Sequence, residues 1–294
     1  MGKSLFGKII GGLFGSKNEA PVAAPDSLYL VDGKADSKAE PKAEHQNTTG
    51  PQDDSWKNIS LAKTLEQQAP RLVNLAKAID VNLKKEKLES LTAKVAFVLD
   101  ASGSMTDQFR GGNVQAVLDR IAALAVQFDD DGNLDLWGFG SKFAKYPDVT
   151  LQNLDGYIKT IQNNCRGENL PGLGGSNNEP PVMNDIINYF KDSEEPVIVY
   201  FITDGGIDKS AEIKKAIAKS AHYPIYWKFI GLGGSNYGVL EDLDDFEDRV
   251  IDNTDFFAID DFKKVSDDVL YSKLLTCIRD WLNEASDKSL FHCK

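Results

Sequence analysis

Two aspartates stand where apolar runs of the sequence end. Asp100 ends one such run and is followed by Ser102 and Ser104, and Asp204 ends a second run. If both runs are strands of one parallel sheet, their carboxyl ends lie at the same edge and bring the two carboxylates together. Carboxylate and hydroxyl oxygens are the ligands that hard cations such as Mg²⁺ prefer. The spacing therefore predicts a divalent-cation site at this edge.

The segments that would position these residues alternate between two patterns. Short, almost continuous apolar runs predict strands at residues 94–99, 134–139, 197–202, 225–230 and 256–259. Amphipathic stretches predict helices at residues 114–128, 154–162, 181–190, 210–221 and 262–282. Strands this apolar are covered on both faces. The predicted fold class is α/β, with a doubly wound, mostly parallel central sheet flanked by helices.

The N-terminal part of the sequence differs in composition from the rest. Residues 18–55 are rich in Ala, Pro and charged residues and poor in large apolar ones, which is typical of a disordered linker. Apolar residues then recur at helical spacing, interrupted by Pro70. The predicted organisation is an amphipathic segment (1–17), this linker (18–55), a helical extension (56–91), the α/β domain (92–286) and a C-terminal tail (287–294).

The first 17 residues combine an apolar stripe with Lys3, Lys8 and Lys17. One interpretation is a peripheral helix whose apolar stripe enters a membrane surface or docks on a partner, with the lysines near anionic headgroups. The alternative is a flexible tail, because the glycines in this segment disfavour a helix. No apolar run approaches the roughly 18–20 residues that a membrane-spanning helix needs.

Composition restricts the class of partner. The chain has 33 Lys and Arg against 45 Asp and Glu, a formal net charge of -12. This balance repels phosphate backbones, so we expect no nucleic-acid partner. The three cysteines are far apart and form no CxxC pair, and the three histidines have no metal-binding spacing. We expect a cytoplasmic protein with reduced thiols.

The motifs at the two aspartates resemble those of a known family. Asp-Ala-Ser-Gly-Ser at residues 100–104 resembles the D-x-S-x-S signature of the metal-ion-dependent adhesion site in von Willebrand factor A (vWA) domains. Thr-Asp-Gly at residues 203–205 resembles its later T-D-G element. Between them the family has a threonine in a Gly-rich loop, and Ser176 in Gly-Leu-Gly-Gly-Ser-Asn stands at the matching place.

The resemblance implies a Rossmann-like vWA fold over about residues 94–283 and a set of metal ligands. Ser102, Ser104 and Ser176 would supply hydroxyl oxygens, and Asp100 and Asp204 would bind the ion directly or through water. A carboxylate from an Asp or Glu of a protein partner would complete the shell. The ion would be Mg²⁺, or another divalent cation such as Mn²⁺ or Ca²⁺.

The sequences of several segments look closest to one bacterial subgroup of vWA domains. Phe-Asp-Asp-Asp-Gly, Trp-Gly-Phe-Gly and Phe-Ile-Gly-Leu-Gly-Gly are similar to the tellurium-resistance and stress-response members. Many of these carry an additional β-rich calcium-binding domain, which we do not expect here. The resemblance implies a non-enzymatic, Mg²⁺-dependent protein-interaction module in a bacterial metal or tellurite stress response.

Three alternatives compete with these assignments. Gly-Leu-Gly-Gly-Ser-Asn recurs at residues 231–236, so Ser235 competes with Ser176, which we favour because it lies between the two aspartates. Asp129-Asp130-Asp131 imitates a calcium loop, but the EF-hand register lacks both anchoring acids. A Mg²⁺-dependent hydrolase of the haloacid dehalogenase type also begins with a strand ending in aspartate. Its general acid would stand two residues later, where this chain has Ser102.

Overall fold

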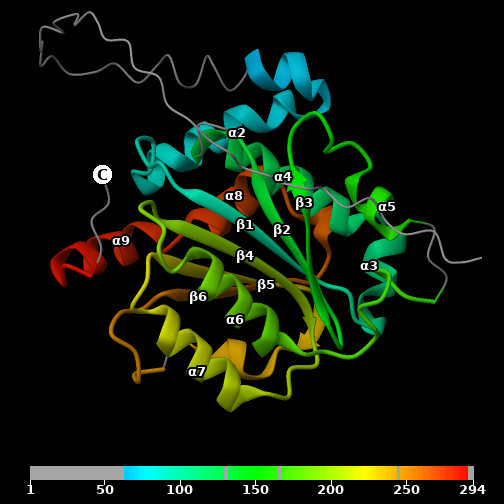
Figure 1. Ribbon diagram of the computed structural model, residues 1–294. Coiled ribbons are helices and arrows are strands. Elements are labelled where there is room, and N and C mark those ends of the chain that lie inside the picture. Colours follow the sequence, from blue (N-terminus) through cyan, green and yellow to red (C-terminus); the bar gives the residue numbers. More distant parts are fainter. Residues whose placement is uncertain (1–62, 129–131, 164–166, 244–245, 291–294) are drawn as a thin grey trace, which may run out of the picture. The chain divides into compact units, whose positions relative to one another are not determined.

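The computed structural model describes residues 63–128, 132–163, 167–243 and 246–290 (Figure 1), without the side chains of Ser235 and Lys263. The predicted amphipathic segment (1–17), the linker (18–55) and the start of the helical extension lie outside the described residues, as does the Asp129–Asp131 turn. None of the described helices is long and apolar enough to span a membrane.

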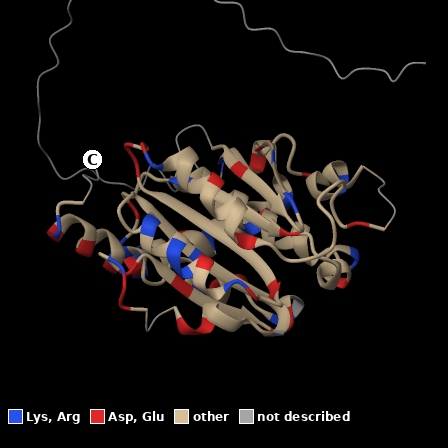
Figure 2. Ribbon diagram, turned by 60° about the horizontal axis from the view of Figure 1, so that its bottom comes forward, with Lys and Arg blue, Asp and Glu red and all other residues tan. Residues whose placement is uncertain are grey.

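A six-stranded sheet forms the centre of the fold, in the order β3-β2-β1-β4-β5-β6. All neighbouring pairs are parallel except β2 with β3. The strands are β1 (Lys94–Asp100), β2 (Leu134–Phe139), β3 (Phe143–Val149), β4 (Val197–Gly205), β5 (Ile225–Asn236) and β6 (Thr254–Ile259). This confirms the predicted doubly wound, mostly parallel sheet. In Figure 2 the charged residues concentrate on helices and loops, and the central strands are mostly uncharged.

Helices cover both faces of the sheet and create two hydrophobic cores (Figure 1). One core receives the apolar sides of α2 (Val73–Glu86), α4 (Asn113–Phe128), α5 (Tyr157–Gln162), α8 (Asp267–Leu275) and α9 (Ile278–Asp287). The other receives α6 (Glu179–Phe190) and α7 (Ser210–Ser220). The chain moves from β1 to β2 on one side and later to β4 on the other. The C-terminal ends of β1 and β4 therefore form the topological switch point, where open α/β sheets bind ligands.

The helical extension packs against the sheet domain. Residues 63–68 are helical, and the chain continues through a 3-10 turn (Pro70–Leu72) into α2. This confirms the predicted break at Pro70, whose missing N–H suits the first turn of a helix. The Arg71 guanidinium pairs with both carboxylate oxygens of Asp119 on α4. Asn82 Nδ2 donates to Asp268 Oδ1 on α8 at 3.0 Å.

The prediction of one long helix over residues 262–282 is wrong. The structure has a 3-10 turn (Phe262–Lys264) followed by two helices, α8 and α9, with a break at Thr276 and Cys277. Cys277 has φ of 65°, which ends the regular helix. Lys228 Nζ donates to the Thr276 carbonyl at 2.7 Å, so a contact from the sheet satisfies the carbonyl that the break frees.

Two elements were not predicted. Strand β3 is the antiparallel edge strand, and six of its seven residues are half-buried or exposed. Its sequence, Phe-Ala-Lys-Tyr-Pro-Asp-Val, contains a proline and two charges, which suit an exposed edge. The short helix α3 (Thr106–Arg110) follows the Asp-x-Ser-x-Ser segment through a 3-10 turn (Gly103–Met105).

Candidate metal centre

Strands β1 and β4 bring Asp100 and Thr203 together. The two strands run parallel in a register that pairs Leu99 with Ile202, so the next residues end side by side. Thr203 Oγ1 donates to Asp100 Oδ2 at 2.8 Å, and the backbone N–H of Ser102 donates to Asp100 Oδ1 at 2.8 Å. Each carboxylate oxygen of Asp100 thus has one donor that fixes its orientation.

Asp100 is fully buried, yet no basic side chain forms an ion pair with it among the described residues. Burial raises the pKa of Asp100 to about 6, against the opposing effect of the hydrogen bonds from Ser102 and Thr203. Burial likewise raises the pKa of Asp204 above its usual value. Two carboxylates whose charged forms are disfavoured in this way form a place where a cation would be stabilised.

Hydroxyl groups connect the two aspartates. Ser102 Oγ and Ser104 Oγ are 3.0 Å apart, and Ser104 Oγ donates to Asp204 Oδ1 at 2.8 Å. Adjacent oxygens around an octahedral Mg²⁺, with metal–oxygen distances of 2.0–2.1 Å, are separated by about 2.9 Å. The spacing of these three oxygens therefore fits neighbouring positions of a Mg²⁺ shell.

Ser176 lies on a loop next to the Asp-x-Ser-x-Ser turn. The backbone N–H of Gly103 donates to the carbonyl of Gly175 at 3.0 Å, which joins the two loops. The hydroxyl of Ser176 is 2.7 Å from that of Ser141 and exchanges a hydrogen bond with it. The structure thus brings Asp100, Ser102, Ser104 and Asp204 into one hydrogen-bonded chain, with Ser176 beside it and bonded to Ser141.

The rival Gly-Leu-Gly-Gly-Ser-Asn segment is not a loop. It continues β5 to Asn236, which pairs with Gly205 at the end of β4. Gly205 has φ of 108°, and a Cβ there would lie 2.2 Å from the Asn236 carbonyl oxygen. A Cβ on Gly234 would lie 1.7 Å from the Asp204 carbonyl oxygen. These glycines permit a close backbone approach that fixes the turn carrying Asp204.

Sequence reasoning missed several residues at this edge. Thr203 orients Asp100, Ser141 holds Ser176, and Asn177 Nδ2 donates to the carbonyl of Gly205. Thr203 was visible in the Thr-Asp-Gly motif, but Ser141 carries no sequence signal because it lies in the unpredicted turn between β2 and β3. Glu179, the first residue of α6, is buried at 2% exposure near Asp100 and was also missed.

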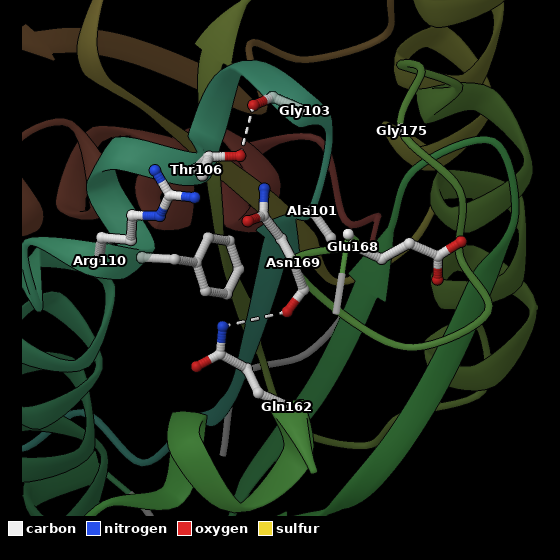
Figure 3. Close-up of a pocket in the computed structure, with 10 residues that line it drawn as sticks. Ala101, Gly103, Thr106, Arg110, Gln162, Glu168, Asn169 and Gly175 are labelled. Atoms are coloured by element: carbon white, nitrogen blue, oxygen red, sulfur yellow. Dashed lines mark hydrogen bonds between the residues drawn. The ribbon is translucent and has the colours of Figure 1, made fainter. Parts of the chain in front are cut away.

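A pocket of about 350 Å³ opens beside the candidate centre (Figure 3). Its wall includes both site loops, through Gly103 and Gly175, together with Arg110 from α3. Asn169 Nδ2 donates to the Ser102 carbonyl, and Gln162 Nε2 donates to the Asn169 carbonyl at 3.2 Å. The amides of the wall are thus engaged internally. Within the described part of the chain, no hydrogen bond or ion pair holds the exposed Arg110 guanidinium, so its donors face solvent at the pocket.

A site rich in soft or imidazole ligands is absent from the described ranges. They contain no cluster of three or more His, Cys, Asp or Glu able to hold a metal ion together. Cys277 is exposed and free, and His222 is exposed. The donor set at the switch point consists of two carboxylates and hydroxyls, which suits Mg²⁺ better than zinc or copper.

Several known proteins are similar to this chain. The uncharacterized protein YcbR of Bacillus subtilis is 40% identical over 218 residues, 73% of this chain and 87% of YcbR. A von Willebrand factor A domain-containing protein of Dictyostelium discoideum is 24% identical, over 58% of this chain and 19% of its own length. A solved von Willebrand factor type A structure from Catenulispora acidiphila is 13% identical. The match covers 63% of this chain and 43% of that structure's chain, with a TM-score of 0.46.

The family model for the vWA domain found in the TerF C terminus matches residues 92–291. The match includes every strand of the sheet and the whole candidate centre. The chain therefore belongs to the vWA-TerF-like family of von Willebrand factor A domains.

Proposed function

We propose that this chain is a non-enzymatic, Mg²⁺-dependent protein-interaction module. Asp100, Ser102, Ser104, Ser176 and Asp204 would hold the ion, and an Asp or Glu carboxylate of a protein partner would complete its shell. The bound ion supplies concentrated positive charge with a coordination position open to an outside ligand. The observation that carries the proposal is the hydrogen-bonded chain that runs from Asp100 through the Ser102 backbone N–H and the two serine hydroxyls to Asp204.

The protein's own groups prepare this centre in different ways. Asp100 is held rigidly by Thr203 and the Ser102 amide, and its burial keeps competing water away. Ser104 and Asp204 are more accessible and face the side from which a partner approaches. Ser176 is exposed, and its hydroxyl would exchange Ser141 for the ion.

The pocket beside the centre gives the partner a second point of contact. A partner residue next to the coordinating carboxylate would enter it and meet the Arg110 guanidinium. Glu168 also lines the pocket, so the positive charge there would come from the ion together with Arg110, and complementarity to these two groups favours an acidic segment although the chain carries a net charge of -12. The ion and Arg110 together would provide the local positive field that an acidic partner needs.

The biological setting follows from the family. We propose a cytoplasmic role in a bacterial metal or tellurite stress response, because the matching family is named after TerF. Residues 1–17 would provide a peripheral membrane contact. Sedimentation with anionic liposomes tests this contact: the full chain should pellet, and a chain lacking residues 1–17 should stay in the supernatant.

The hydrolase alternative gains no support. Position 102 is a serine whose hydroxyl is bonded to Ser104, so no carboxylic acid stands where a haloacid dehalogenase needs its general acid. The family match places the chain among von Willebrand A domains instead. Turnover of p-nitrophenyl phosphate by the wild type, lost in Asp100→Asn, would contradict the non-enzymatic proposal.

Calorimetric titration of Mg²⁺ tests the centre. The wild type should bind the ion, Asp100→Asn should show no binding heat, and Ser104→Ala should bind more weakly. Asp192→Asn, which changes an exposed aspartate in the turn after α6, is the matched control and should bind as the wild type does. Absence of heat in the wild type, or equal heats in Asp100→Asn, would overturn the proposal.

A pull-down tests the partner. A protein retained in Mg²⁺ should be released by EDTA and should not be retained by Asp100→Asn. Retention that survives both changes would show that the interaction does not use the ion.

A further inference from the structure

Glu179 is a buried acid without a counter-charge. It is the first residue of α6 and is 2% exposed, and no other described residue donates a hydrogen bond to either of its carboxylate oxygens. The other buried acids are satisfied: Asp100 accepts two hydrogen bonds, and Asp119 accepts from Arg71 and Gln115. Glu179 is thus exceptional among the buried carboxylates of the described ranges.

The segment leading into α6 is fixed against the end of β4. Glu179 follows Ser176 by three residues, and between them Asn177 donates to the carbonyl of Gly205. Lys209 Nζ donates to Asn178 Oδ1 at 2.6 Å. Lys209 is exposed and bonded to this amide, so its charge favours the ionised carboxylate only from a distance and forms no ion pair with it. Burial, with a smaller contribution from the charge of Asp100, raises the pKa of Glu179 to about 7.

This placement is costly for the protein alone. An ionised carboxylate buried without a partner is destabilised by several kcal/mol. The N-terminus of α6 offsets only a small part of this destabilisation. A divalent cation between Asp100 and Asp204 would supply the missing positive charge at short range. The buried charge of Glu179 would therefore destabilise the cation-free protein and be compensated only in the cation-bound form.

We propose, on the basis of the function proposed above, that Glu179 is a third acidic group of the metal centre and holds a water molecule on the bound cation. Direct coordination does not fit, because no three acids of the described ranges lie close enough to hold one ion. Mg²⁺ keeps several of its waters in proteins. Carboxylates of an outer shell that accept hydrogen bonds from metal-bound groups commonly set metal affinity.

The third acid changes the balance of charge at the centre. Asp100 and Asp204 match the charge of one divalent ion, and Glu179 would add attraction for the ion from behind a water molecule, without occupying a coordination position. The free protein would therefore hold its cation without help from a partner. Glu179 would thus raise the affinity of the free protein for the cation, and the partner's carboxylate would bind to a centre that already holds its ion.

Glu179→Gln tests the inference, because it keeps the shape of the side chain and removes the charge. Calorimetric titration of Mg²⁺ should show affinity reduced by about 10-fold to 100-fold, as for other outer-shell ligands. The matched control is Asp208→Asn, an exposed aspartate whose charge also acts on Glu179. Because that charge is solvated and screened, the control should stay within about twofold of the wild type.

Thermal unfolding provides a second measurement that also verifies folding. In EDTA, Glu179→Gln should melt at the same temperature as the wild type or higher, since it relieves a buried charge. In excess Mg²⁺ the wild type should gain more than the variant. Equal Mg²⁺ affinities of the wild type and Glu179→Gln would overturn the inference and leave the proposed function standing. An equal loss in Asp208→Asn would also overturn it, as an effect of general charge. A wild type that binds no Mg²⁺ would overturn both.

Discussion

Two sets of buried charged residues in this domain differ in whether the protein supplies a counter-charge. Lys228 in β5 is fully buried, but it pairs with Asp255 on the neighbouring strand and donates to the Thr276 carbonyl. At the switch point Asp100 and Glu179 are equally buried and have no basic partner among the described residues. The first set contains its own counter-ion, and the second consists of acids alone.

This difference indicates a structural role for the first set and a functional role for the second. A buried ion pair with its hydrogen bonds complete needs nothing from outside and positions the elements it joins, here β5, β6 and the break between α8 and α9. Buried acids without a cation reduce the stability of the protein and are retained where an external cation gives them a role. The comparison therefore makes predictions about which site responds to Mg²⁺ and which does not.

The largest effect is expected at the self-contained pair. Lys228→Ala leaves the Asp255 carboxylate and the Thr276 carbonyl without their shared donor. Breaking a buried pair from one side should reduce the free energy of unfolding by about 3 kcal/mol. Urea denaturation measures this, and the loss should be the same in EDTA and in Mg²⁺.

The control for this variant is Lys84→Ala, which removes an exposed lysine paired with Asp80 within α2. An exposed pair of this kind contributes about 0.5 kcal/mol or less. A loss at Lys228 no greater than that at Lys84, or one that Mg²⁺ restores, would break the distinction between the two buried sites.

A pH-dependent effect is expected at the acidic site. The folded protein holds the protons of Asp100 and Glu179 more tightly than the unfolded chain, because the pKa values are raised to about 6 and about 7. The native state therefore binds more protons between the ordinary and the raised values. In EDTA the free energy of unfolding should fall as pH rises from about 4 to about 8, then level off.

Mg²⁺ should act in the opposite direction on the same groups. It binds the ionised carboxylates, so the stabilisation it provides should grow as pH rises. Denaturation curves at several pH values, with and without Mg²⁺, measure both trends. Asp100→Asn should flatten the decline in EDTA, and a decline unchanged in that variant would assign it to other groups.

The sequence predicted the acidic site better than it predicted what surrounds it. Four of its residues could be identified from the sequence because they stand at or just after the end of an apolar strand, and strand ends at a switch point converge: Asp100, Ser102, Ser104 and Asp204. Ser141 and Glu179 could not be identified from the sequence by this rule. Ser141 follows a strand whose neighbour β3 is an irregular edge, and Glu179 looks like an ordinary acid at the start of a helix.

The same limit explains the error in the C-terminal helices. Helical periodicity continues across Thr276 and Cys277, so nothing local indicates a break. The break is accompanied by a contact from Lys228, which lies 48 residues earlier in the chain. Buried strands were predicted well because their apolar runs are local, whereas long-range polar contacts of single side chains leave no periodic pattern.

The smallest effect is expected at the pocket, where Arg110 contributes to the partner's binding and not to the ion's. Arg110→Gln should leave Mg²⁺ affinity unchanged, since the guanidinium is exposed and bonded to none of the proposed ligands in the described part of the chain. It should weaken association with the protein recovered in the Mg²⁺-dependent pull-down by about twofold to fivefold, the usual scale of one exposed charge pair. Biolayer interferometry with that protein measures the change, and Arg279→Gln on α9 is the matched control. If Arg110→Gln also reduced Mg²⁺ affinity, the pocket would belong to the metal centre itself. If both variants bound the partner equally, the pocket would have no part in recognition, and the acidic site would act through the ion alone.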